Sequence, residues 1–217
     1  EEINRVLTDH ISTLLFCPTK ESVKNLSNEG ITSEIFHVGD VMYDVTLLAK
    51  AIVRKKETKL EKTLYFTKRN FALMTIHRQE STANETTFSK IMDFGDEYAK
   101  KNNLIIIFPV HPRTKSLINP YRESPNFLFV DPFSYLEVQY AIGKANAILT
   151  DSGGLQKEAY FHRVPCITLR SETEWVETIS NGWNRLWTNE KYNPRMPIED
   201  YGNGNGAKKI LDVLLNI

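Results

Sequence analysis

The fold is most easily worked out from one segment, Ala147-Ile-Leu-Thr-Asp-Ser-Gly-Gly-Leu-Gln-Lys-Glu-Ala-Tyr-Phe161. Residues 147–150 are apolar and end in a β-branched threonine, a pattern typical of a buried strand. From Leu155 onward apolar residues recur at helical spacing, so residues 151–154 form a glycine turn between a strand and a helix. Paired glycines let backbone N–H groups approach a ligand, and a helix N-terminus offers unpaired donors with a partial positive charge. The turn therefore suits a phosphate or a diphosphate.

The same turn has a purely structural interpretation. Ser152 can cap the helix while the two glycines only reverse the chain, and such turns are common in α/β proteins. Glu158 follows one helical turn later, where a carboxylate can accept hydrogen bonds from the two hydroxyls of a ribose. From this segment alone, ligand binding and a structural turn remain equally open.

Composition excludes several classes of protein. The chain has 217 residues, 41% of them hydrophobic, and 27 basic residues balance 27 acidic ones. We expect neither nucleic acid nor a membrane as a partner, since there is no basic excess and no apolar run of transmembrane length. No signal peptide opens the chain, so a cytoplasmic protein is expected. Cys17 and Cys166 are expected to be buried thiols, with a disulfide as the alternative, and the sequence lacks zinc-site spacings. We expect no metal and no cofactor.

Apolar strands alternate with helices along most of the chain. This alternation predicts an α/β fold with a doubly wound, Rossmann-like parallel sheet covered on both faces. A βαβ piece precedes the sheet, and a helix from residue 41 is expected to give way to a solvated charge run at 54–59, the expected domain boundary. The helical pattern already begins at Glu1, so we expect the chain to be cut from a longer protein. The predicted strands are 13–17, 35–38, 71–76, 104–108, 127–130, 147–150 and 164–169. Thr19 and Asn84 are expected N-caps of the helices that follow them, and further helices are expected at 113–117 and 135–144.

Chemically useful side chains follow five of the predicted strands. In an open parallel sheet, ligands bind beyond the carboxyl ends of the strands, so these side chains are expected to converge. The five groups are His77-Arg-Gln-Glu80, His111-Pro-Arg113, Asp131-Pro-Phe133, Asp151-Ser-Gly-Gly154 and Arg170-Ser-Glu-Thr-Glu174.

These residue types suit a nucleoside diphosphate. His77 could donate to a phosphate oxygen or act as a general acid, and Phe133 or Tyr135 could line a base pocket. Forked donors come from Arg78, Arg113 and Arg170. Each has a structural alternative: the histidine could bind a carbonyl, the aromatic rings could only pack, and arginines often pair with a nearby glutamate. The local pairs would be Arg78 with Glu80 and Arg170 with Glu172.

Six motifs occur in order along the chain: Glu1-Glu-Ile-Asn-Arg5, Phe16-Cys-Pro-Thr19, His77-Arg-Gln-Glu80, Pro109-Val-His111, Leu149-Thr-Asp-Ser-Gly-Gly-Leu-Gln-Lys-Glu-Ala159 and Thr173-Glu174. Together they resemble the non-hydrolysing UDP-N-acetylglucosamine 2-epimerases. The resemblance spans the whole chain, and its most specific part is the Asp-Ser-Gly-Gly block with its glutamate.

The resemblance implies the C-terminal half of a glycosyltransferase-B-like, two-domain architecture with the active site between the halves. Residues 1–40 would be the tail of the N-terminal domain and the connection, and residues 41–217 the UDP-binding domain. The helix at 207–216 would pack back toward the N-terminal half. The implied reaction inverts C2 of a UDP-linked N-acetylhexosamine by anti elimination of UDP and re-addition to the other face. The implied partners are UDP or UDP-GlcNAc, the missing N-terminal domain and a second copy in a homodimer.

The resemblance also assigns roles to residues. The catalytic residues would be Glu1, a carboxylate, and His77, beside the diphosphate. Glu80 and His111 would correspond to a second, activating UDP-sugar site. The substrate-binding residues would be Arg78, Phe133, Tyr135, Val138, Ser152, Gly153, Gly154, Glu158, Arg170, Thr173 and Glu174. Among them, the serine and the two glycines would hold phosphate, the glutamate in the helix would hold ribose, and Phe133 and Val138 would line the uracil pocket.

Two departures qualify the resemblance. The lysine, aspartate and further glutamate of the family's N-terminal half have no counterpart here, so we predict that this chain alone is inactive. The family pattern Thr-Glu-Arg-Pro-Glu appears as Thr173-Glu-Trp-Val-Glu177, similar to the branch acting on UDP-2,3-diacetamido-glucuronic acid. That substrate is one alternative. Another is a glycosyltransferase of the same architecture, and a third is a nucleotide-binding module without catalysis.

Overall fold

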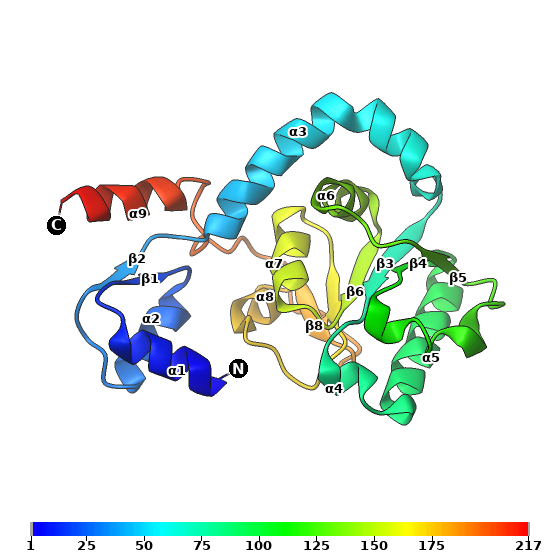
Figure 1. Ribbon diagram of the computed structural model, residues 1–217, viewed down its shortest axis with the longest axis horizontal. Helices are drawn as coiled ribbons and strands as arrows, with labels where there is room; N and C mark the ends of the chain where they lie inside the picture. The colour runs from blue at the N-terminus through cyan, green and yellow to red at the C-terminus, as the bar shows by residue number, and fades with distance from the viewer. Residues whose placement is uncertain (1, 217) are drawn as a thin grey trace. The chain divides into compact units, whose positions relative to one another are not determined.

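The computed structural model describes residues 2–216, which divide into two compact units. The first consists of residues 1–48 and 198–217, and the second of residues 49–197. The division falls within one long helix, α3 (Val41–Thr63). Figure 1 shows the elements of each unit in the colours of their sequence position.

The second unit is built on a six-stranded sheet in the order β5-β4-β3-β6-β7-β8. Every neighbouring pair of strands is parallel. The chain moves outward from β3 through β4 to β5, returns to the centre at β6, and then moves outward in the other direction, which is the order of a Rossmann fold. The topological switch point lies between β3 and β6. The strands are β3 (Phe71–Thr75), β4 (Ile105–Pro109), β5 (Phe127–Val130), β6 (Ala147–Thr150), β7 (Cys166–Thr168) and β8 (Asn184–Leu186).

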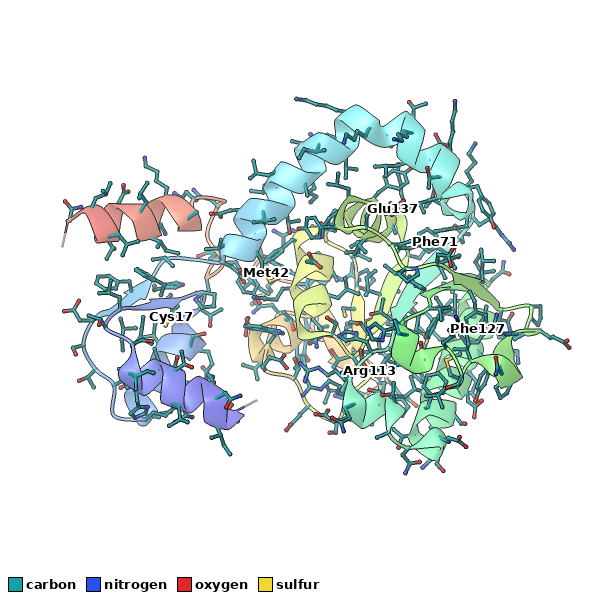
Figure 2. All side chains as sticks on the ribbon, viewed as in Figure 1. Cys17, Met42, Phe71, Arg113, Phe127 and Glu137 are labelled. Carbon is teal, nitrogen blue, oxygen red and sulfur yellow. The ribbon has the colours of Figure 1, made fainter. Side chains whose placement is uncertain are left out.

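Both faces of this sheet are covered, because alternate residues of each strand point to opposite sides. Phe71 packs with Ile148 on the face covered by α6 (Tyr135–Lys144), α7 (Gly153–Phe161) and the end of α3. Met74 packs on the other face, where α5 (Glu85–Asn102) contributes its apolar side and Phe127 joins the same core. The labels in Figure 2 mark Phe71 and Phe127 in these two cores. The predicted doubly wound parallel sheet is confirmed.

The first unit contains a two-stranded parallel sheet, β1 (Leu15–Cys17) with β2 (Ile35–His37). Helix α2 (Lys20–Asn28) connects the two strands and is capped by the Thr19 side chain, as predicted. Helix α1 (Glu2–Ile11) precedes them and α9 (Gly206–Leu215) ends the described chain. The Asp44 carboxylate accepts the backbone N–H of Ala207 at 2.7 Å, which fixes the start of α9 to the first turn of α3.

The elements differ from the expectations in three ways. The charge run at 54–59 is exposed, as expected, but it continues α3 instead of ending it, since lysine, arginine and glutamate are good helix formers. The expected helix at 113–117 is instead a 3-10 turn at Pro112–Thr114. Several short elements were not predicted: the 3-10 turns Tyr65–Lys68 and Asn119–Tyr121, α4 (Gln79–Thr82), α8 (Val176–Ser180) and β8.

Both cysteines are free thiols and both are buried. Burial raises the pKa of the Cys166 thiol, so this sulfur is uncharged at neutral pH. Within residues 2–216, no helix is long and apolar enough to cross a membrane.

Candidate functional site

Asp151 joins the ends of the two central strands at the switch point. Its fully buried carboxylate, which follows β6, accepts the backbone N–H of His77 at 3.0 Å and that of Arg78 at 2.9 Å, both of which follow β3. The hydroxyls of Thr75 and Thr150 hydrogen-bond to each other at 2.6 Å one step earlier in the same strands. The sequence predicted a turn at Asp151, and the structure adds that this carboxylate fixes the position of the neighbouring loop.

His77 is therefore held beside the start of α7 while its ring stays partly open to solvent. Nδ1 of His77 lies 3.4 Å from Oδ1 of Asp151, and the side chain is 41% exposed. Its carbonyl accepts a hydrogen bond from the Arg113 guanidinium at 3.0 Å; Arg113 is labelled in Figure 2. These contacts fix the backbone of His77. The exposed part of its imidazole is available to a ligand.

The glycine turn forms the N-terminus of α7, as predicted. Ser152 is the N-cap residue, with extended backbone, and Gly153 is the first helical residue. A Cβ atom on Gly153 would collide with Oε1 of Glu174 and lie 3.3 Å from Nε1 of Trp175. The glycine is therefore required for the close approach of the loop that follows β7, and it leaves the first backbone donors of α7 beside these two side chains.

The Glu174 carboxylate contacts two arginines beside the N-terminus of α7. It accepts a hydrogen bond from Arg170 at 2.8 Å and lies 3.5 Å from the guanidinium of Arg78. Arg170 also lies 3.7 Å from Glu80, one of the two residues predicted for a second site. Arg170 pairs with Glu174 and Glu80 rather than with the expected Glu172, and Arg78 lies beside Glu174, because the loop after β7 folds over the loop after β3.

Two more residues of the β7 loop are held by buried contacts. Thr173 donates to the side-chain oxygen of Gln156 at 2.6 Å and accepts the backbone N–H of Trp175 at 3.1 Å. The ammonium of Lys157 lies 3.9 Å from the centre of the Trp175 ring, a cation–π contact. The indole Nε1 of Trp175 is buried and has no hydrogen-bond acceptor among the residues that the structure describes.

Glu158 lies one turn into α7 and is 8% exposed. It accepts a hydrogen bond from Nε2 of Gln139 at 2.7 Å and another from the hydroxyl of Tyr135. Burial raises the pKa of this carboxyl group, against the opposite effect of its hydrogen bonds with Gln139 and Tyr135. Tyr135 was predicted to bind substrate, whereas Gln139 was not among the predicted site residues. The sequence feature that could have identified Gln139 is its position, as a polar residue, within the apolar face of the predicted helix.

An apolar cavity of about 180 Å³ opens at the ends of β3 and β4. Phe133 and Val138, the predicted uracil-pocket residues, line it together with both His77 and His111. The rings of the two histidines have centroids 5.8 Å apart. Phe133 stacks against Phe66 on one side with an interplanar angle of 17°, which leaves only its other face for a ligand.

The predicted residues thus gather into three adjoining groups within the second unit. The turn at the start of α7 is adjacent to the loop after β7, Glu158 lies within α7, and the apolar cavity lies at the ends of β3 and β4. Glu1, the predicted catalytic carboxylate, lies outside the described residues.

The sequence model of a family described as "UDP-N-acetylglucosamine 2-epimerase" matches residues 1–215. The chain belongs to this family. It is 46% identical over 234 residues to a UDP-N-acetylglucosamine 2-epimerase homolog of Methanococcus maripaludis, covering 100% of this chain and 64% of the relative. It is also 38% identical over 189 residues to the UDP-2,3-diacetamido-2,3-dideoxy-D-glucuronate 2-epimerase of Pseudomonas aeruginosa, covering 86% of this chain and 51% of the relative.

Solved structures of family members agree with the fold. The UDP-GlcNAc 2-epimerase of Methanocaldococcus jannaschii, in complex with UDP-GlcNAc and UDP, matches with a TM-score of 0.88 and 36% identity, covering 100% of this chain and 65% of that one. The enzyme of Neisseria meningitidis bound to UDP-GlcNAc matches with a TM-score of 0.86 and 27% identity, again over 100% of this chain and 65% of the other. The chain spans between about half and two thirds of the length of these relatives.

Proposed function

We propose that the switch point of the second unit binds the UDP part of a UDP-linked N-acetylhexosamine whose C2 the complete enzyme epimerises. One observation carries this proposal: Asp151 holds the loop of His77 against the N-terminus of α7, so an imidazole and the first backbone N–H groups of that helix converge on one space. A diphosphate is the anion that such a space accommodates. The family membership and the UDP-sugar complexes of relatives support the same ligand.

The diphosphate would lie at the glycine turn. The backbone donors at Gly153 and Gly154, the Ser152 hydroxyl and the exposed side of His77 would contact its oxygens. Arg78 and Arg170 reduce the repulsion between the diphosphate and Glu174, because both guanidinium groups already face that carboxylate. The unpaired indole N–H of Trp175 beside Gly153 is a further donor on the same side.

The nucleoside would extend from this turn along α7. Glu158 would accept hydrogen bonds from the ribose hydroxyls, each worth about 1.5–3 kcal/mol for a charged acceptor. The uracil would occupy the apolar cavity, with Val138 on one side and the free face of Phe133 on another.

In the reaction, a base removes the proton from C2 while the bond between C1 and the diphosphate oxygen breaks. The electron pair of the C–H bond forms the C1–C2 double bond of a 2-acetamidoglucal, and UDP leaves with its negative charge. Re-addition of UDP at C1 and delivery of a proton to the opposite face of C2 complete the inversion. The residues of the switch point would stabilise the charge that develops on the leaving diphosphate.

We further propose that catalysis needs chain beyond these 217 residues. The relatives are longer, and none of residues 2–216 is assigned here as the base that removes the proton from C2. Glu1 remains a predicted catalytic residue. We also propose that the parent enzyme is a homodimer, as the resemblance implies.

Solvent deuterium tests the reaction class. The longer protein that carries this chain is incubated with UDP-GlcNAc in heavy water, and the sugar is analysed by NMR. Deuterium at C2 of the recovered UDP-sugar supports epimerisation. Transfer of an unlabelled sugar to an acceptor would contradict it and indicate a glycosyltransferase.

A second substrate is favoured by one observation, the Trp-Val pair at positions 175–176 together with the Pseudomonas aeruginosa relative. The matched experiment repeats the deuterium exchange with UDP-2,3-diacetamido-2,3-dideoxy-glucuronate. The substrate with the higher kcat/KM for exchange is then assigned to the enzyme.

A further inference from the structure

Three side chains form a buried relay between α6 and α7. Nε2 of Gln139 donates to Glu158 at 2.7 Å, and the other end of the same amide, Oε1, lies 2.8 Å from Nε2 of His162. Gln139 is completely buried. His162 is the C-cap residue of α7, four residues after Glu158, so both side chains lie on the same side of the helix and reach the same glutamine on α6.

Each end of the relay fixes the orientation of the glutamine amide. A side-chain amide can rotate to exchange its oxygen and nitrogen, but only the nitrogen can donate to the charged carboxylate of Glu158. That choice directs Oε1 at His162, whose Nε2 must then carry the proton, because a carbonyl oxygen only accepts. Burial, with a further contribution from the charge of Lys50, lowers the pKa of His162 to about 4, so the ring is neutral at pH 7.

The packing of α6 accommodates the imidazole. Gly143, one helical turn after Gln139 on α6, lies against the ring: a Cβ atom at this position would come within 3.2 Å of Nδ1 of His162. Glycine is unfavourable within a helix relative to alanine, so its presence here is explained by the space that the ring needs.

We propose that Gln139 and His162 are positioning residues that hold the Glu158 carboxylate in the orientation that accepts the ribose hydroxyls. This inference rests on the proposed function, since it assumes that Glu158 contacts ribose. The geometry leaves Glu158 its remaining lone pairs for a ligand, because the relay and Tyr135 each use one hydrogen bond. Without Gln139, the carboxylate would lose a donor that opposes the cost of its burial and could rotate away from the ribose.

The test is nucleotide discrimination measured by titration calorimetry on the 217-residue chain at pH 7.5. The two probes are UDP and 2′,3′-dideoxyuridine 5′-diphosphate, which differ only in the two hydroxyls. The wild-type chain is expected to bind UDP at least about tenfold more tightly, as for hydrogen bonds to a charged group. Gln139→Met keeps the side-chain volume and removes both the donor (Nε2) and the acceptor (Oε1) of the side-chain amide. It is expected to weaken UDP about five- to tenfold and to leave the dideoxy nucleotide within about twofold.

Two further variants complete the design. His162→Leu removes the donor at the far end of the relay and is expected to lower the discrimination in the same direction by a smaller factor. It also provides the test if Gln139→Met fails to fold. Lys144→Met is the matched control on α6. It removes the surface ion pair with Glu57 and a cation–π contact with Tyr140, neither of which involves the relay, so both affinities should be unchanged.

The possible results distinguish a failure of the positioning role from a failure of the proposed ribose contact. A wild-type chain that binds both nucleotides equally, or neither, overturns the proposed ribose contact and the relay together. A wild-type chain that discriminates, with discrimination unchanged in both relay variants, overturns the positioning role alone. Equal weakening of both nucleotides in Gln139→Met would also overturn it, because that result indicates only a structural contribution.

Discussion

The Asp151 carboxylate and the backbone N–H of His77 are joined across the switch point at 3.0 Å, although the residues are 74 positions apart in the sequence. The aspartate is completely buried, so the contact is protected from water. It makes the position of the His77 imidazole depend on the end of β6 rather than on its own loop. The proposed arrangement of the site depends on this hydrogen bond.

Replacing Asp151 by asparagine should impair both folding and binding. The amide retains one acceptor, but its NH₂ group faces N–H donors, so the free energy of unfolding is expected to fall by about 1–3 kcal/mol. UDP affinity should fall as well, because the His77 loop is released. Asp96→Asn is the control: Asp96 accepts from Ser124 and Asn126 at a structural position. It should lower stability in urea titrations without changing UDP affinity, and equal UDP affinities for the two variants would contradict the prediction.

Removing the His77 side chain should affect the diphosphate specifically. In His77→Ala the affinity for UDP is expected to fall by about tenfold, the effect of one hydrogen bond to a charged phosphate. UMP lacks the β-phosphate and should bind within about twofold of wild type. The control is His37→Ala in the first unit, where Nε2 of the imidazole lies 2.9 Å from the carbonyl oxygen of Asp200. Calorimetry with both nucleotides provides the measurement, and an equal loss of UMP affinity would place His77 elsewhere.

Glu158 is expected to improve binding at the expense of stability. Its pKa is raised by burial, so the folded state holds the proton more tightly than the unfolded chain does. Its contribution to stability is therefore fully present below the usual pKa of glutamate and is lost as pH rises through the raised value. Glu158→Gln should be more stable than wild type at pH 8 and equally stable at pH 4, while its UDP affinity falls by about tenfold. Thermal unfolding across this range tests it; a smaller stability difference at pH 8 than at pH 4 would refute it.

His162 should produce the opposite dependence on pH. Its pKa of about 4 lies below that of a histidine in an unfolded chain, about 6.5, so the unfolded state binds the proton first. Stability from this residue is fully present above pH 6.5 and is lost as pH falls toward 4, by up to about 3 kcal/mol. His162→Gln keeps a donor for Gln139 but does not titrate. The difference between wild type and variant isolates the effect, because Glu158 is present in both. Parallel stability curves between pH 4 and 7 would rule out a buried neutral imidazole.

Local signals in the sequence were sufficient for much of the fold. The caps at Thr19 and Asn84, the apolar strands and the glycine turn at Gly153 each depend on near neighbours, and all three kinds of signal were read correctly. β8 was not predicted, because the strand lacks an apolar run. Its buried residue Asn184 is polar and hydrogen-bonds to Thr168 and Gln156. The full extent of α3 was not predicted, because an exposed charge run carries no apolar periodicity and yet continues the helix.

Long-range contacts limited the prediction of the site. The convergence of His77 with the turn after β6 followed from parallel topology alone. The pairing of Arg78 and Arg170 with Glu174 did not, because it depends on how the loop after β7 folds over its neighbours. The relay through Gln139 depends on the register between two helices, which no local pattern encodes.

The most direct test of the UDP site is a titration of the isotope-labelled 217-residue chain with UDP, followed by backbone amide NMR. Saturable shifts are expected at Ser152, Gly153, Gly154, His77 and Glu158, at a stoichiometry of one. Absence of shifts at these amides at millimolar UDP, or saturable shifts confined to other residues, would contradict the proposed UDP site.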